Sequence, residues 1–170
     1  LVREICNSRA YKRSVQSTES NQSDTRNFSK STIRRVRAEV LLDIISQVTD
    51  TQNKFRGLPN GSSAVEIVDG GTSTFFLTTF GRATRTTVCS CEVALEPNLS
   101  QALHLLNGDT VNTKCSQCGV VRKLLQAGKK PEDVIDELYI RCLARKPTET
   151  EKTKLMAFVG EEDRTDEEVL

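Results

Sequence analysis

Residues 33–48 decide the fold, and they read IRRVRAEVLLDIISQV. Apolar residues recur every four positions in this stretch, at Val36, Val40, Ile44 and Val48, and Leu41 and Ile45 widen the stripe. Apolar residues at this spacing lie on one face of an α-helix. The stretch therefore predicts a helix from near Ile33 to Val48 that buries this face.

Further helices are predicted on both sides of this stretch. They cover residues 1–13, residues 99–107 after a cap at Asn98, residues 109–126 after a break at Gly108, residues 131–143, and a last helix capped by Thr148 and Glu151. Residues 14–32 predict a loop, and residues 64–68 predict a short strand or extended segment. The expected fold class is mainly α: an irregular helical domain with long loops and at most a short β segment.

The composition and the two ends of the sequence indicate a globular fragment of a larger domain. The 170 residues are 36% hydrophobic and 28% charged, which is ordinary for one folded domain. The chain opens on Leu1 within a helical pattern, and Thr165 to Glu168 form a capping box just before the last residue. We expect residues 1–170 to be a single domain that is the C-terminal fragment of a larger one. No apolar run is long enough for a membrane span.

Several function classes receive little support from the residues. The densest basic cluster, Arg34 to Arg37, lacks the interleaved aromatic residues of a nucleic-acid surface, so no nucleic-acid partner is expected. Arg35, Glu39 and Asp43 follow each other at four-residue spacing, which favours salt bridges on one helix face. The loops at residues 69–71 and 80–82 offer an acid and a guanidinium to a ligand, although glycines at such places usually serve turns.

Six cysteines are the main chemical feature of the chain. Cys89 and Cys91 are separated by one residue, which gives too small a ring for ordinary disulfide geometry. They are expected to meet Cys115 and Cys118, either as two disulfides or as a four-thiolate zinc site, and free thiols are the third alternative. His104 is a candidate to replace one sulfur ligand, although a position beside the core is its simpler interpretation.

Two further observations limit the cofactors that this segment is expected to bind. Cys6 and Cys142 lie on apolar helix faces and are expected to be small buried residues. Covalent haem needs a histidine directly after a Cys-x-x-Cys pair, but Gly119 follows Cys118. No cofactor is therefore expected in this segment apart from the zinc alternative.

Several motifs together resemble one family. They are residues 38–43 (AEVLLD), 75–82 (FFLTTFGR), 89–92 (CSCE) and 99–107 (LSQALHLLN). In order and spacing the chain resembles the planctomycete domain of unknown function 1553, over roughly residues 1 to 160. It departs from the family pattern at Ala83-Thr84, where a Pro-rich pair is expected, and at Val93, where arginine is usual. The pair Cys115 and Cys118 is not part of that pattern.

The resemblance implies a context rather than a reaction. Members are typically exported proteins in which this domain accompanies a second unknown domain and often a c-type cytochrome module. We therefore expect a periplasmic or extracellular location, an upstream domain as partner, a possible cytochrome c partner, and a binding or structural role. The alternative is part of an extracytoplasmic enzyme, polymer-degrading or redox, whose site needs the upstream half. Arg82, Glu92 and His104 are the ligand-binding candidates, and their meeting in one pocket would favour the enzyme.

Overall fold

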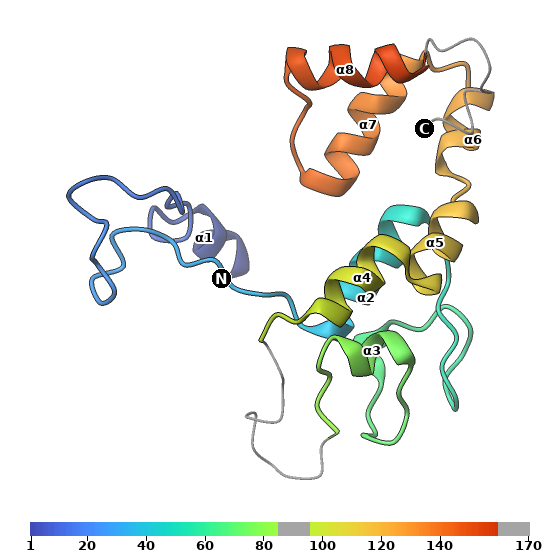
Figure 1. Ribbon diagram of the computed structural model, residues 1–170, viewed down its shortest axis with the longest axis horizontal. Coiled ribbons are helices and arrows are strands. Elements are labelled where there is room, and N and C mark those ends of the chain that lie inside the picture. Colours follow the sequence, from blue (N-terminus) through green and yellow to red (C-terminus); the bar gives the residue numbers. More distant parts are fainter. Residues whose placement is uncertain (85–95, 160–170) are drawn as a thin grey trace. The chain divides into compact units, whose positions relative to one another are not determined.

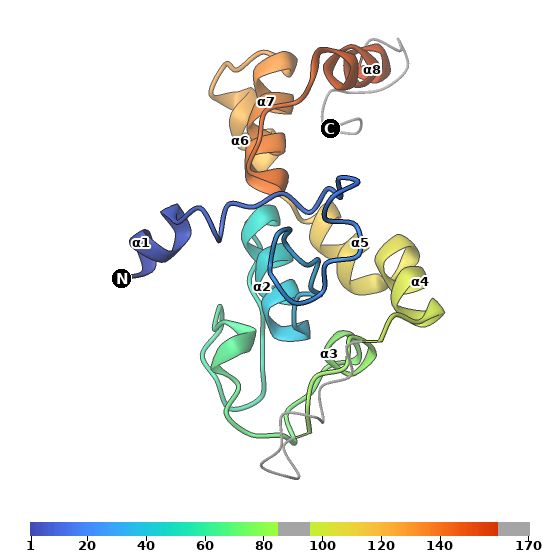
Figure 2. The same ribbon diagram turned by 90° about the vertical axis from the view of Figure 1, so that its left-hand side faces the viewer.

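The computed structural model describes residues 1–84 and 96–159, and the chain forms two compact units, Leu1–Val36 and Arg37–Leu170. Within the described ranges it consists of helices and loops without a strand, which confirms the mainly α fold class (Figures 1 and 2). The elements are α1 (Val2–Asn7), α2 (Ala38–Thr49), the 3₁₀-helix η1 (Ala64–Glu66), α3 (Phe75–Thr79), α4 (Leu99–Asn107), α5 (Asp109–Ser116), α6 (Val120–Gln126), α7 (Pro131–Leu143) and α8 (Glu149–Val159). The expectation of a single domain that continues upstream stays a prediction.

The first unit begins with α1, a helix that buries none of its residues. The prediction of a helix to about Arg13 is wrong because the backbone becomes extended at Ser8, with φ −65° and ψ 149°. The Ser8 hydroxyl then accepts the amide of Tyr11 at 3.2 Å, a bond that competes with helical pairing. Cys6 is exposed on α1, so the prediction that it is buried is also wrong.

The loop that follows α1 is organised around Asp24. Its carboxylate accepts the backbone amides of Asn27 at 2.7 Å and of Arg26 and Ser29 at 3.0 Å each. The hydroxyl of Ser29 also donates to it. The Ser29 hydroxyl and these three amides hold the pKa of the Asp24 carboxyl well below its usual 3.8. The loop predicted for residues 14–32 thus contains a compact acid-centred turn.

Helix α2 is present, but it begins later than predicted and buries a different face. It starts at Ala38, after an extended N-cap at Arg37. Its buried residues are Ala38, Leu42, Ser46 and Thr49. Val40 and Ile44, which the apolar pattern placed inside, are 39% and 41% exposed. The predicted face is therefore wrong at Val36, Val40 and Ile44, whereas Leu41 and Ile45 pack against the core as expected.

Two hydroxyls explain why α2 buries this face. Ser46 donates to the carbonyl oxygen of Leu42, and Thr49 donates to that of Ile45, each at 2.8 Å. A serine or threonine that bonds back to the preceding turn carries no unsatisfied donor into the core. A pattern of apolar residues alone cannot identify such positions, because it counts Ser46 and Thr49 as polar.

The core of the second unit lies between α2, η1 and α3. Its buried residues are Ala38, Leu42, Phe55, Ala64, Ile67, Phe76, Leu77 and Phe80. The segment predicted as a short strand instead contains η1, which is closed by a capping box between Ser63 and Glu66. That box is a local signal for a helical turn, and it prevails over the β-rich composition of residues 64–68.

Asp43 attaches η1 to α2. Its carboxylate accepts the Ser63 hydroxyl at 2.7 Å and the amides of Ala64 and Val65 at 2.6 and 3.2 Å. Arg35 precedes the first residue of α2, so it does not share a helix face with Glu39 and Asp43 as expected. The carboxylate of Asp43 serves to cap η1.

Local capping signals set the boundaries of α4 and α5. Asn98 and Gln101 form a capping box at the start of α4, and the chain breaks at Gly108 as predicted. The single helix expected for residues 109–126 is wrong, since α5 ends at Ser116 and α6 begins at Val120. Gly119 lies at this second break, where it forms the N-cap of α6.

Gly108 has a close steric neighbour in His104. A Cβ at Gly108 would lie 2.3 Å from the His104 carbonyl oxygen and 2.7 Å from Cγ of its ring. We expect Gly108→Ala to lower the free energy of unfolding by about 1–3 kcal/mol, because the ring or the α4–α5 junction must shift. Urea unfolding measures this change. Gly119→Ala is the matched control, since it is also a helix N-cap and its Cβ would meet only Lys123 Cε at 3.8 Å. Equal losses in the two variants would contradict the steric explanation.

The last two helices form the pair that the sequence predicts. Helix α7 runs from Pro131 to Leu143, and α8 follows a capping box in which Thr148 N donates to Glu151 Oε2 at 2.8 Å. Arg145 Nη2 lies 2.8 Å from Glu151 Oε1, and together with Thr148 it lowers the pKa of Glu151 from 4.5 to about 2. Cys142 is exposed on α7, contrary to expectation. The capping box at residues 165–168 lies outside the described residues.

Basic side chains from α5, α6 and α7 converge on the C-terminal end of α2. Lys114 Nζ donates to Thr51 Oγ1 at 3.1 Å, Lys123 pairs with Asp50, and Arg141 donates to the carbonyl oxygen of Val48 at 3.2 Å. The C-terminal end of a helix carries partial negative charge, which favours cations there. These contacts attach the later helices to α2.

Candidate binding site

A buried arginine follows the end of α3. Gly81 has φ +77°, and this left-handed turn lets the Arg82 amide donate to the carbonyl oxygen of Leu77 at 2.9 Å. The side chain of Arg82 is 2% exposed. The chain is therefore turned so that a charged side chain enters the interior, where it needs partners.

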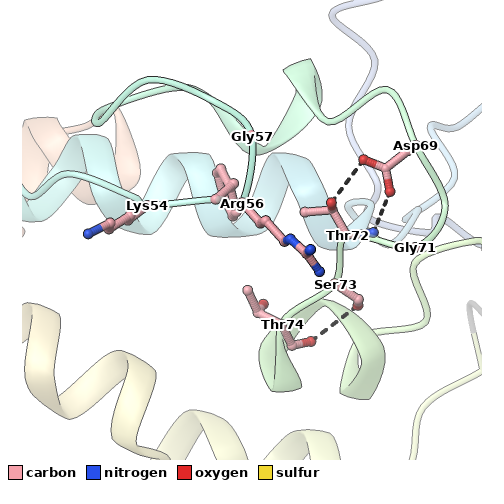
Figure 3. Close-up of a pocket in the computed structure, with 9 residues that line it drawn as sticks. Lys54, Arg56, Gly57, Asp69, Gly71, Thr72, Ser73 and Thr74 are labelled. Carbon is pink, nitrogen blue, oxygen red and sulfur yellow. Dashed lines mark hydrogen bonds between the residues drawn. The ribbon is translucent and has the colours of Figure 1, made fainter.

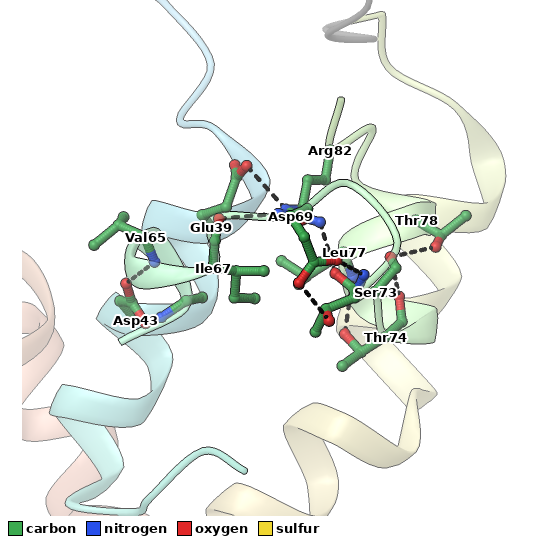
Figure 4. Close-up of polar contacts among 12 residues, drawn as sticks. Glu39, Asp43, Val65, Ile67, Asp69, Ser73, Thr74, Leu77, Thr78 and Arg82 are labelled. Carbon is green, nitrogen blue, oxygen red and sulfur yellow. Dashed lines mark hydrogen bonds and ion pairs between the residues drawn. The ribbon is translucent and has the colours of Figure 1, made fainter. Parts of the chain in front are cut away.

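The partners of Arg82 are a carboxylate and the loop after η1 (Figure 4). Its Nε lies 3.3 Å from Glu39 Oε1 on α2. Its Nη1 donates to the carbonyl oxygen of Thr72 at 2.7 Å, and its Nη2 donates to those of Asp69 and Ile67 at 2.9 and 3.3 Å. One guanidinium thus fixes the backbone of residues 67–72 against α2.

Asp69 closes the turn in this loop. Its carboxylate accepts the amide of Thr72 and, at 2.8 Å, the hydroxyl of Thr72. These hydrogen bonds from Thr72 lower the pKa of Asp69 below its usual 3.8. The carboxylate is therefore ionised near neutral pH, but Thr72 already occupies both of its oxygens.

The loop held by Arg82 forms one wall of a cavity of about 670 Å³ (Figure 3). The cavity is lined by Lys54, Phe55, Arg56, Gly57, Asp69, Gly71, Thr72, Ser73 and Thr74. Its volume lies within the usual range for small-molecule sites, about 300–1,000 Å³. The lining carries two cations and one anion, so its net charge is positive.

Arg56 is one of the two cations that line this cavity. Arg56 lies in the turn that follows Phe55, and the buried Phe55 lies between the exposed Lys54 and Arg56. Figure 3 shows the Arg56 guanidinium pointing toward the Ser73 and Thr74 side of the cavity, whereas Lys54 extends in another direction. Sequence reasoning missed Arg56. The charged–aromatic–charged alternation of residues 54–56 was the available signal.

Hydroxyl groups face Arg56 from the start of α3. Thr74 Oγ1 accepts the amide of Leu77 at 3.3 Å, which leaves its own O–H as a donor. Ser73 and Thr78 share a hydrogen bond of 2.9 Å between their hydroxyls. The Thr72 hydroxyl donates to Asp69 and that of Ser73 to the Thr74 carbonyl oxygen, so Thr74 is the lining hydroxyl that keeps a donor for a ligand. Together with Lys54 and Arg56 it suits a ligand that supplies acceptors.

A second polar cavity, of about 440 Å³, lies beside the C-terminal half of α2. Its lining includes Asp43, Ser46, Asn53 and Ser63. Asp43 is bonded to Ser63, and Ser46 donates to Asn53 Oδ1 at 3.0 Å. Because these polar groups bind one another, this cavity offers a ligand less than the first one does.

His104, a predicted ligand-binding candidate, lies on α4 among aromatic rings. Its ring centroid is 5.3, 5.5 and 6.0 Å from those of Phe75, Phe76 and Phe80. The residue is 7% exposed, and its Nε2 has no hydrogen-bond partner in the part of the chain that the structure describes. Arg82 and His104 both neighbour α3, but neither lines the two cavities above.

The predicted cysteine cluster is described in part. Cys89, Cys91 and Glu92 lie outside the described residues, so their meeting with Cys115, Cys118 or His104 stays a prediction. Cys115 is exposed and Cys118 is half-buried, and both are free thiols. Within residues 1–84 and 96–159 no three His, Cys, Asp or Glu side chains are placed to hold a metal ion. The zinc site that includes Cys89 and Cys91 also stays a prediction.

Comparison with known proteins gives a family. The family model described as PSD1, a protein of unknown function (DUF1553), matches residues 1–159. The chain belongs to the DUF1553 family. This match confirms the family resemblance of the motifs in residues 38–107, although neither a planctomycete source nor a cytochrome association follows from it. No curated protein and no solved structure matches the DUF1553 chain.

None of the helices in the described part of this DUF1553 chain combines the length and the apolar character that a bilayer crossing requires.

Proposed function

We propose that this DUF1553 chain is the helical binding module of an exported protein, and that its cavity beside Arg56 takes an acidic segment of an envelope polymer. The family resemblance supports two parts of this proposal, namely that the protein is exported and that it functions beside a c-type cytochrome module. The ligand class comes from the cavity. The observation that carries it is the Arg56 guanidinium, which points toward the Ser73 and Thr74 side of a cavity of about 670 Å³ and has no ion pair among the described residues.

The charge pattern favours a carboxylate-bearing ligand. A guanidinium binds a carboxylate through two parallel hydrogen bonds, and such charge-assisted bonds are stronger than neutral ones. Thr74 and the other hydroxyls suit the hydroxyl-rich body of a sugar acid. Two cations against one satisfied anion, Asp69, give the lining a positive field that attracts an acidic polymer.

Binding fits this cavity better than acid–base catalysis does. Asp69 is the one carboxylate in the lining, and both of its oxygens accept hydrogen bonds from Thr72. A general base needs a free acceptor within reach of the proton that it removes. The enzyme alternative, which relies on residues beyond this cavity, is decided by the same experiment.

The test is calorimetric titration of the chain at low ionic strength with trigalacturonate and with its fully methyl-esterified form. We expect the acidic trimer to bind and the neutral ester to bind at least tenfold more weakly. Arg56→Met should weaken binding of the acid about tenfold or more, because one charge-assisted hydrogen bond contributes about 1.5–3 kcal/mol. Lys54→Met removes the same charge from a side chain that points elsewhere, so its loss should be smaller.

Two results would count against the proposal. Equal affinity for the acid and the ester would show that Arg56 does not discriminate between a charged and a neutral ligand. Cleavage of the trimer during the titration would favour the enzyme alternative over the binding module.

A further inference from the structure

The junction between α5 and α6 contains two thiols in one turn. Cys115 lies in the last turn of α5, and Cys118 directly precedes Gly119, the N-cap of α6. The Cys118 amide donates to the carbonyl oxygen of Cys115 at 3.1 Å. Such a turn keeps its first and fourth Cα atoms within about 7 Å. Disulfides need Cα atoms roughly 4.4–6.8 Å apart, so the backbone already has a suitable shape.

A third thiol approaches from α7. Helix α6, which Cys118 and Gly119 precede, packs against α7. The side chains of Lys114 on α5 and Arg141 on α7 both reach the C-terminal end of α2, at Thr51 and Val48, and Cys115 and Cys142 directly follow these two residues. Although Cys142 is exposed as a residue, partial burial of its sulfur raises the pKa of its thiol, in agreement with this packing.

We propose that Cys115 and Cys118 form a reversible dithiol–disulfide pair, with Cys142 as a third thiol that exchanges with it. This inference is independent of the proposed ligand of the cavity. It also differs from the pairing of Cys115 and Cys118 with Cys89 and Cys91, since the bond forms within one turn.

The reaction uses a low-molecular-weight disulfide as oxidant. The exposed Cys115, as thiolate, attacks one sulfur of the oxidant and releases one thiol, which leaves a mixed disulfide on the protein. Cys118 then loses its proton, attacks the Cys115 sulfur and displaces the second thiol. The protein gives up two protons and two electrons, and the oxidant leaves as two thiols. Cys142 can then attack either sulfur, which moves the bond without net oxidation.

The short ring indicates a bond that is easily reduced. A disulfide stabilises a protein mainly by restricting the unfolded chain, and it does so more for long loops than for short ones. Closing one turn restricts little, so a thiol reductant should reverse the bond readily.

Trypsin separates the cysteines conveniently for a test. Cleavage after Lys and Arg places Cys6 in peptide 4–9, Cys89 and Cys91 in 86–114, Cys115 and Cys118 in 115–122, and Cys142 in 142–145. The full chain is equilibrated with reduced and oxidised glutathione at several ratios, alkylated, digested and mapped by mass spectrometry. We expect peptide 115–122 to lose both alkyl groups as the ratio becomes oxidising, with a mass two hydrogen atoms below that of the unmodified dithiol, and to regain the alkyl groups after reduction.

Variants identify the role of each thiol. Cys142→Ser should remove a minor cross-linked species that joins peptides 115–122 and 142–145, while the internal bond in 115–122 persists. Cys118→Ser combined with Cys142→Ser should leave a stable glutathione adduct on Cys115. Cys6→Ser is the control and should change nothing, because Cys6 belongs to the other compact unit.

Three results would overturn the proposal. They are two free thiols in peptide 115–122 at every glutathione ratio, a stable glutathione adduct on Cys115 in the unmodified chain, and a cross-link between peptides 86–114 and 115–122 as the main product.

Discussion

Replacing Arg82 with methionine is expected to lower the free energy of unfolding by roughly 3–5 kcal/mol, the cost of breaking a buried charge network by removing one partner. The variant leaves Glu39 without its cation and the carbonyl groups of Ile67, Asp69 and Thr72 without their donors. Methionine retains much of the volume, so the loss reports on polar partners rather than on a cavity. Urea unfolding followed by circular dichroism measures the change.

Two further variants separate the parts of this network. Arg82→Lys keeps the charge but lacks the planar fork that reaches several acceptors at once, so we expect a loss close to that of the methionine variant. Glu39→Gln should cost less, because the Glu39 side chain is 19% exposed and water can replace part of the ion pair. A loss below about 1 kcal/mol for Arg82→Met would be typical of an exposed salt bridge and would contradict the buried network.

Truncation of Phe76 to alanine is expected to cost about 3–5 kcal/mol, the usual range for a large aromatic side chain deleted from a core. Phe76 is 1% exposed and stacks on Phe80 with ring centroids 4.4 Å apart. Its loss leaves a cavity among α2, α3 and His104. The same urea experiment measures the effect.

Phe75 provides the matched control on the same helix. It precedes Phe76 directly but is 75% exposed. Phe75→Ala should cost less than about 1 kcal/mol, mainly through its contact with His104. If the two substitutions destabilise equally, the placement of the core beneath α3 is wrong.

The elements that the sequence predicts well are those fixed by local signals. Pro131 at the first turn of α7, and the capping boxes at Asn98 and Thr148, involve residues three or four positions apart. Such signals act within one turn of the chain and need no tertiary partner. Gly108 similarly marks the end of α4, at a position where a side chain would meet His104.

The buried face of α2 was not predictable from its apolar pattern, because tertiary packing decides it. Val40 and Ile44 complete the better apolar stripe, yet Ser46 and Thr49 are buried instead, with their hydroxyls bonded to the preceding turn. The 3₁₀-helix η1 was missed for a different reason. Its Ser63 to Glu66 capping box is readable in the sequence, but the prediction of an extended segment rested on the β-rich residues 64–68 alone.

The sequence indicated one part of the candidate site and not the other. The loops at residues 69–71 and 80–82 were noted as carriers of an acid and a guanidinium, and they do meet. The orientation of Arg82 depends on where distant backbone carbonyls lie, and no spacing rule gives that. Arg82 holds the cavity wall, whereas Arg56, which the sequence reading passed over, faces the cavity.

A nuclear magnetic resonance titration of the labelled chain with trigalacturonate tests the central claim most directly, because it locates the ligand. The account predicts that the amide signals of residues 54–57 and 69–74 shift together and saturate, and that in Arg56→Met the same shifts need about tenfold more ligand or above while the rest of the spectrum stays intact. Saturable shifts confined to other residues, or none at ligand concentrations that saturate a weak site, would contradict it.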